Sequence, residues 1–158
     1  MRLVAIVVLM ALAYVQQGAD PIAATTLEHE RESLRGLPGV RVVIEYLSPE
    51  AKADGLSEDS IRSAVELILR SSGIHIFEVG RLPYLYVRVT TFKVQASSFH
   101  AAAMQVELRQ WLSQPEWSGY AATWQEMIVG NQNMRAVISH IEQMVKQFAN
   151  DFLVANPK

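Results

Sequence analysis

The C-terminal end of the chain carries the pattern that most constrains its fold. Apolar residues recur there mostly at steps of three and four: Met134, Val137, Ile138, Ile141, Val145, Phe148 and Phe152. This spacing places them along one face of an α-helix that ends before Pro157. A helix with one apolar face must bury that face against another element, so the chain needs a second layer beneath it.

Runs rich in β-branched and aromatic residues predict that this second layer is a sheet. Strands are expected at 40–47, 74–77, 84–92, 99–112 and 119–129, with a polar loop at 48–56 and a hairpin loop at 113–118. Helices are expected at 25–35 and from an N-cap at Ser57 to a terminator at Gly73. Because the second helix lies between the strands at 40–47 and 74–77, these two strands should be parallel. The predicted fold class is α+β: a two-layer sandwich in which a mixed five-stranded sheet carries the two main helices on one face, in the order α-β-α-β-β-β-β-α.

The first residues have the features of an export signal rather than of a folded element. Arg2 precedes thirteen uncharged, largely apolar residues, Leu3–Val15, whereas a membrane-spanning helix needs about 20. A positive start and a short apolar centre are typical of a secretory signal peptide. We place cleavage after Ala24, with retention as an uncleaved anchor as the alternative. The predicted organisation is a signal peptide at 1–24 and a single α+β domain at 25–158, periplasmic or secreted in a bacterium, with no membrane span after cleavage.

The composition excludes several classes of function. The chain has 14 Lys and Arg against 16 Asp and Glu, so it lacks the basic surplus that nucleic-acid binders normally show. It has no cysteine, which removes disulfides, thiolate metal sites and a cysteine nucleophile. The sequence contains no nucleotide-binding glycine loop, GxSxG serine or HExxH motif, and its four histidines share no metal-ligand spacing. We therefore expect no catalytic residue, no metal and no cofactor, and a protein that is not an enzyme.

The sheet face opposite the helices should gather aromatic and basic side chains. Residues of one strand alternate between the two faces, and closing the last two strands around 113–118 puts Trp111 near Tyr120 and Glu107 near Trp124. Seven residues are the candidate binding site on this face: Tyr86, Arg88, Phe92, Arg109, Trp111, Tyr120 and Trp124.

Three interpretations of this face remain open. Aromatic residues suit strands without any further role. Aromatic residues mixed with arginine are also enriched at protein interfaces, which favours an envelope protein partner or a homodimer. The same rings could stack on a small apolar or sugar-like ligand. The predicted function is a non-catalytic exported interaction module that binds a protein partner, with a small-ligand binding protein as the alternative and an unrecognised hydrolase as a more remote one.

Residues 32–158 also resemble a family of small exported bacterial proteins of unknown function. The pieces that carry the resemblance are Gly55-Leu56 before a helix, Pro83-Tyr84-Leu85-Tyr86-Val87, and the closing Phe148, Asp151 and Ala155-Asn156-Pro157. The family has no defined catalytic motif, so the resemblance assigns no functional residue. The order of elements is similar to that of envelope α/β modules such as the N-terminal domain of TolB and the periplasmic activators of peptidoglycan synthases. This chain differs from the lipoproteins among them because it has no cysteine to accept a lipid.

Overall fold

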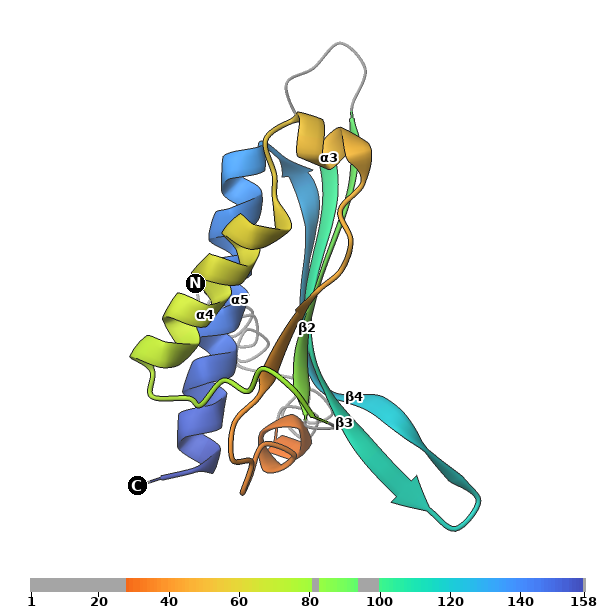
Figure 1. Cartoon of the computed structure of the whole chain (residues 1–158), viewed down its shortest axis with the longest axis vertical. Helices are drawn as coiled ribbons and strands as arrows, with labels where there is room; N and C mark the ends of the chain where they lie inside the picture. Colours follow the sequence, from red (N-terminus) through yellow and green to blue (C-terminus); the bar gives the residue numbers. More distant parts are fainter. Residues whose placement is uncertain (1–27, 81–82, 94–99, 158) are drawn as a thin grey trace, which may run out of the picture.

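Two layers, a β-sheet and a pair of helices, make up the computed structural model, which describes residues 28–80, 83–93 and 100–157. The strands are β1 (Arg41–Ile44), β2 (Tyr84–Lys93), β3 (His100–Gln114) and β4 (Trp117–Gln132), and the helices are α3 (Pro49–Ala53), α4 (Glu58–Ser71) and α5 (Met134–Ala155). Figure 1 shows α4 and α5 side by side on one face of the sheet. No helix within the described ranges is long and apolar enough to cross a membrane. The predicted signal peptide lies outside these ranges.

The sheet is mixed, but it has four strands in the order β1-β2-β3-β4. β1 runs parallel to β2, and β2, β3 and β4 are antiparallel to their neighbours. The mixed α+β fold with both helices on one face is therefore confirmed, and the prediction of five strands is wrong. The α4–α5 pair covers the face that buries Leu85, Val106 and Leu108.

The predicted strand at 74–77 is reduced to a single parallel bridge between Val40 and Ile76. The N–H of Val40 donates to the carbonyl of His75, and the carbonyl of Val40 accepts from the N–H of Phe77, both at 3.0 Å. Pairing stops there because the chain next crosses to the other side of β1, where the carbonyl of Pro83 accepts from Arg41. The expected parallel pairing survives, but over one residue only.

Gly39 lies where the chain enters β1, directly against this bridge. Its φ is +149°, and a Cβ at this position would lie 2.3 Å from the carbonyl oxygen of His75. We expect Gly39→Ala to lower the free energy of unfolding by more than about 2 kcal/mol, because the backbone must move to relieve the clash. Urea-induced unfolding measures this effect.

Gly36→Ala is the matched control. Gly36 also has a positive φ, +73°, but a Cβ there would meet nothing within 4 Å. This variant should lose only the cost of a left-handed conformation, about 1 kcal/mol. Equal losses in the two variants would contradict the close approach at Gly39.

Both α3 and α4 begin at serine caps. The Ser57 side chain accepts from the N–H of Ser60 at the start of α4, and Gly73, with a φ of +75°, follows its end, as the sequence predicts. The predicted loop at 48–56 is wrong, since it contains α3. The Ser48 side chain caps α3, and Pro49 occupies the first turn, where its missing N–H needs no partner.

Glu58 joins the two helices electrostatically. Its Oε1 lies 2.8 Å from Lys52 Nζ and accepts from the N–H of Leu47 at 3.1 Å. The hydrogen bond from Lys52, followed by that from Leu47, lowers the pKa of Glu58 from 4.5 to about 2. The ionised carboxylate therefore stabilises the fold above pH 4.5, and this contribution is lost as the pH falls towards about 2.

The variant Glu58→Gln tests this linkage. Above pH 4.5 its free energy of unfolding should be lower than that of the wild type. As the pH falls, the wild type loses the contribution of the ionised carboxylate and the variant does not, so the two free energies of unfolding converge near pH 2. The effect is small, because the side chains of Lys52 and Glu58 are 35% and 29% exposed, so solvent screens the pair. Denaturant unfolding across this pH range measures the difference, and a constant difference at every pH would contradict the linkage.

The ends of the chain follow the sequence pattern closely. Residues 28–32 are helical and end in a turn at 33–36, within the helix predicted at 25–35. The last strand runs three residues beyond the predicted end at 129, and Asn133 then caps α5 by accepting from the N–H of Ala136 at 2.9 Å. α5 ends at Ala155, before Pro157, as its periodicity predicts.

The hairpin of β3 and β4 is longer than expected. Gln114 pairs with Trp117, so the loop predicted at 113–118 shrinks to a two-residue turn. Beyond the sheet the hairpin bends away from the helices as a projecting arm (Figure 1). Side chains 111–118 are all exposed on this arm.

Candidate interaction surface

A β-bulge in β4 decides which side chains reach the uncovered face. Arg109 pairs with Ala122, but its neighbour Leu108 pairs with Trp124, so Thr123 is an extra residue in β4. Side chains alternate along a strand, and one extra residue therefore reverses the face of every residue beyond it. Trp111 pairs with Tyr120 as predicted, since both lie on the arm side of the bulge.

Trp124 consequently faces the helices, and its predicted place in the binding site is wrong. Glu107 pairs with Gln125 rather than with Trp124. The indole of Trp124 is 2% exposed, lies 5.1 Å from the Phe148 ring between centroids, and donates from Nε1 to Asp151 Oδ2 at 3.1 Å. It is a core residue that joins β4 to α5.

The bulge is held by a turn from the other end of the sequence. The carbonyl of Thr123 accepts from Ser33 Oγ at 3.0 Å. Gln110 Nε2 donates both to Thr123 Oγ1 and to the carbonyl of Ser33, each at 2.8 Å. The carbonyl and the hydroxyl of the bulged residue thus both accept hydrogen bonds from side chains.

Four rings form a continuous row on the uncovered face, which we term the aromatic row: Tyr86, Tyr84, Tyr120 and Trp111. Successive ring centroids are separated by 6.4 Å, 5.1 Å and 5.3 Å, and each pair meets edge to face. This geometry is the preferred one for aromatic pairs. Tyr86 and Tyr84 come from β2, Tyr120 comes from β4 and Trp111 comes from β3, so the row spans three strands of the sheet and ends at the base of the projecting arm.

Two arginines of this face are paired with carboxylates. Arg88 Nε lies 2.8 Å from Glu45 Oε2, and Arg109 Nε lies 2.7 Å from Glu107 Oε2. The hydrogen bond to Glu45 raises the pKa of Arg88 above its ordinary value. The Arg109 guanidinium also lies 4.2 Å from the centroid of the Tyr86 ring, within cation–π range. These two ion pairs therefore balance the charges of Arg88 and Arg109, whereas a third arginine, Arg41, places its guanidinium 5.5 Å from the centroid of the Tyr84 ring.

Six of the seven predicted site residues lie on the uncovered face, as the strand pairing places them: Tyr86, Arg88, Phe92, Arg109, Trp111 and Tyr120. Phe92 lies apart from the aromatic row, at the opposite end of the sheet. There it belongs to what we term the apolar patch: Phe92, Ala101, Ala103, Met127 and Val129.

The binding site predicted from the sequence does not include three large side chains of this face: Tyr84, Met127 and Val129. Strand alternation alone placed Tyr84 beside Tyr86 on this face. Met127 and Val129 reach it only because of the bulge, for which the sequence holds no glycine or proline signal. A correct register was therefore needed to find them.

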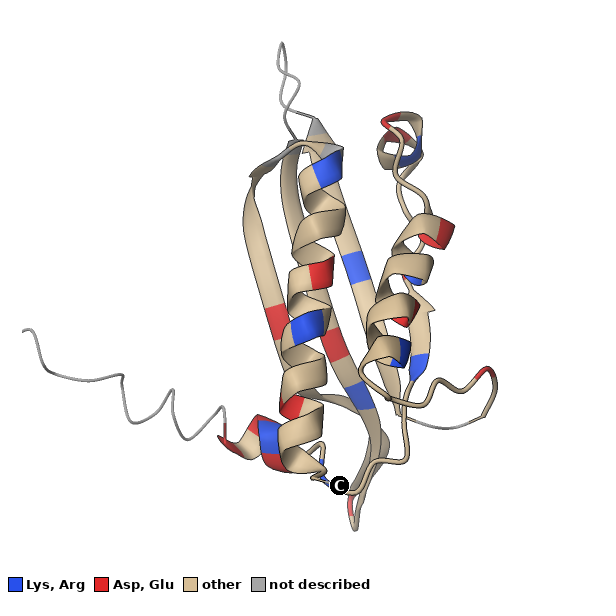
Figure 2. Cartoon of the chain, turned by 90° about the vertical axis from the view of Figure 1, so that its left-hand side faces the viewer, with Lys and Arg blue, Asp and Glu red and all other residues tan. Residues whose placement is uncertain are grey.

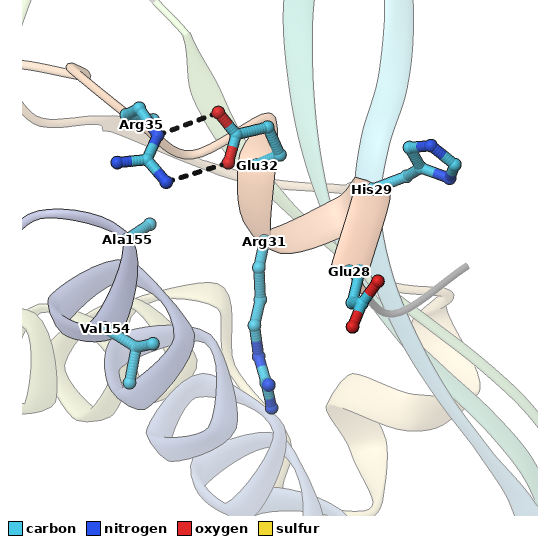
Figure 3. A pocket seen from close by; sticks show the side chains of 7 residues that line it. All are labelled: Glu28, His29, Arg31, Glu32, Arg35, Val154 and Ala155. Atoms are coloured by element: carbon cyan, nitrogen blue, oxygen red, sulfur yellow. Dashed lines mark hydrogen bonds and ion pairs between the residues drawn. The ribbon is translucent and has the colours of Figure 1, made fainter. Parts of the chain in front are cut away.

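A cavity of about 430 Å³ lies away from this face, between residues 28–35 and the end of α5 (Figure 3). Glu32 and Arg35 pair with each other at 2.8 Å, which lowers the pKa of Glu32. The Arg31 side chain points towards α5, where its Nε lies 2.7 Å from Asp151 Oδ1. The His29 side chain points away from α5. The described residues contain no group of three or more histidine, aspartate or glutamate side chains that could hold a metal ion.

Comparisons with known proteins assign the chain to no family. No family model and no curated protein matches it. Among solved structures, a minor lipoprotein from Acinetobacter baumannii is similar over 75% of this chain and 92% of that chain, with 6% sequence identity and a TM-score of 0.29. A TM-score this low supports no inference about fold or function. The function is therefore inferred from the uncovered sheet face itself.

Proposed function

We propose that the protein is an exported, non-catalytic interaction module that binds a protein partner through the uncovered face of its sheet. The observation that carries this proposal is the aromatic row, on the sheet face opposite α4 and α5. Aromatic side chains beside arginine are enriched at protein interfaces, because they bury a large area with few rotatable bonds. The export part of the proposal rests on the predicted signal peptide.

Large side chains on this face are accessible at both ends of the sheet. Trp111 is 50% and Tyr120 37% exposed at one end, and Phe92 is 70%, Met127 61% and Val129 69% exposed at the other. Contiguous apolar surface is limited on soluble monomeric proteins and commonly marks an interaction site when it occurs. The exposure therefore supports a docking role more strongly than a role in packing.

The shape and charge of the face favour a protein over the other ligand classes considered. Small-molecule sites are concave and bury most of the ligand, whereas the aromatic row crosses a sheet face and continues onto a projecting arm. The ion pairs of Arg88 with Glu45 and of Arg109 with Glu107 neutralise two of the arginines on this face, which limits the charge available to attract a strongly charged polymer.

Site-specific photo-crosslinking in the cells that make the protein tests the proposal. A photoreactive phenylalanine analogue at position 111 or 127 should give a discrete protein adduct of reproducible mass. Leu67 is the control position, because it is 69% exposed but lies on α4, on the helix side of the molecule. No such adduct is expected there.

The outcomes separate the interpretations of this face. An adduct of twice the chain mass, formed also by the purified protein, identifies a second copy as the partner. An adduct of any other defined mass, formed only in cells, identifies a different protein. The absence of adducts at 111 and 127, or the same adducts at 67, contradicts the proposal.

A further inference from the structure

The outer edge of β4 is open over much of its length. β4 is the last strand of the sheet, and within the described residues it pairs with β3 alone. The edge is covered at Thr123, whose carbonyl accepts from Ser33. Over 125–131, no hydrogen bond from another described segment reaches it. The opposite edge is short, because β1 has four residues and Ile76 bridges to Val40 beside it.

The hydrogen bonds of β1 identify which backbone groups of β4 point to the open edge. The N–H of Arg41 donates to the carbonyl of Pro83, and the N–H of Glu45 donates to that of Val87. Along a strand, the polar groups of successive residues point to opposite sides. Followed through the pairing of β2 with β3 and of β3 with β4, this alternation directs the polar groups of Ile128 towards β3. The groups at the open edge therefore belong to Gln125, Met127, Val129 and Asn131.

These four residues are symmetric about Ile128, which makes the edge self-complementary. A second copy can pair antiparallel with the same edge around a two-fold axis at Ile128. Met127 then lies opposite Val129 of the second copy, and Gln125 lies opposite Asn131 of the second copy. Every outward N–H and carbonyl of the set gains a partner within the set, as the ladder of an antiparallel pair requires.

Charge and the neighbouring hydrogen bonds favour the same axis. Glu126 is the only charged residue of β4, the outer strand of the sheet (Figure 2). With the axis at Ile128 it faces Gly130 of the second copy, whereas an axis at Glu126 would place like charges opposite each other. Moving the axis by one residue from Ile128 would require pairing with Thr123 or Asn133, and the carbonyls of both already accept hydrogen bonds. A single register therefore remains.

The side chains of this edge also suit pairing with a second copy. Met127 is 61% and Val129 is 69% exposed, and the register brings them together as apolar cross-strand pairs. Ile128 is partly buried against the core and meets its own counterpart on the helix side. β4 contains no lysine and no proline, the residues that commonly protect an edge strand from pairing.

We propose that two copies of the chain pair edge to edge through 125–131 of β4. The product is one continuous sheet of eight strands, four from each copy. Residues opposite each other in an antiparallel pair project to the same face, so both helix layers lie on one side and both uncovered faces lie on the other. The pairing uses the edge of the sheet and leaves the aromatic rows free, so it goes beyond the proposed function and does not rest on it.

Analytical ultracentrifugation of the purified protein is the first test. We expect a species of twice the chain mass whose share rises with protein concentration. Val129→Lys should raise the dissociation constant of this dimer about tenfold, because a symmetric interface meets the added charge twice. A protein that stays monomeric at every concentration would overturn the proposal. If such a monomer still forms an adduct with a different protein at position 111, the proposed function stands without the pairing.

Phe92→Lys is the matched control for Val129→Lys. Phe92 is 70% exposed and belongs to the same apolar patch, but it lies on β2, away from the open edge. Dimerisation should therefore be unchanged in this variant. Equal weakening of the dimer by the two substitutions would show that the copies associate through the face of the sheet, which contradicts pairing through the edge.

Single cysteines introduced into this cysteine-free chain test the register. At Ile128 the two copies form a pair without mutual hydrogen bonds, in which Cα atoms lie about 4.5 Å apart. This separation is within the range of a disulfide, so Ile128→Cys should give covalent dimers on mild oxidation. In Glu126→Cys the two Cα atoms lie about 14 Å apart, and few covalent dimers should form. Equal crosslinking of the two variants would contradict the register.

Discussion

Replacing Trp124 with alanine should lower the free energy of unfolding by about 3–5 kcal/mol, the range for large aromatic truncations in a core. The indole is 2% exposed, packs edge to face on Phe148 and donates to Asp151. The substitution therefore leaves both a void and a buried carboxylate oxygen with one hydrogen bond fewer. Denaturant unfolding followed by circular dichroism measures the loss without relying on tryptophan fluorescence.

Trp111→Ala is the matched control for this prediction. Trp111 is the same residue type on the neighbouring strand but is 50% exposed on the uncovered face. Its ring contact with Tyr120 is worth about 1 kcal/mol, which sets the expected loss. If the two variants lost equal stability, Trp124 would not face the helices, and the position of the bulge would be wrong.

Replacing Asp151 with alanine should lower the free energy of unfolding by about 2–3 kcal/mol. Its carboxylate is buried and accepts from Arg31, Trp124 and Gln147 at 2.7, 3.1 and 3.2 Å. It therefore ties the helical residues 28–32 and β4 to α5, and its loss leaves the indole N–H of Trp124 buried without a partner. The expected value lies below that for a fully buried ion pair, because the Arg31 side chain is 45% exposed.

Two further variants show whether burial is the cause. Asp151→Asn keeps an oxygen for Trp124 while removing the charge, so its loss should be intermediate. Glu142→Ala removes a carboxylate from the same helix, but that group is 38% exposed and lies 4.0 Å from Lys146, so the loss should stay below about 0.5 kcal/mol. Comparable losses for Glu142→Ala and Asp151→Ala would show that the buried network does not stabilise the fold.

Most elements of the fold could be predicted because their signals are local. The stripe of α5, the serine cap of α4 and the alternation of β2 are each encoded within one segment, and each element lies where the pattern puts it. The strand predicted at 74–77 has the right composition but forms one bridge. The number of residues that pair with β1 depends on where the chain leaves this edge of β1 for the opposite edge, where Pro83 bonds to Arg41. No local sequence pattern specifies that point.

The candidate site could be predicted only as far as the bulge. On the arm side of Thr123, loop closure placed Trp111 beside Tyr120 correctly. Beyond it, the facing of Trp124 depends on one extra residue whose polar groups are satisfied by Ser33 and Gln110. Ser33 is 90 residues away in sequence, so a segment-by-segment interpretation does not detect this contact.

Hydroxyl-radical footprinting of the purified protein and of intact cells tests the central claim most directly, since it reports the accessibility of the uncovered face in both states. In the purified protein, Trp111 and Met127 should be oxidised much faster than Trp124. In cells, a docked partner should slow the oxidation of Trp111 and Met127 and leave that of Leu67 on α4 unchanged. Slow oxidation of Trp111 and Met127 in the purified protein, or equal rates for them in both states, would contradict the account.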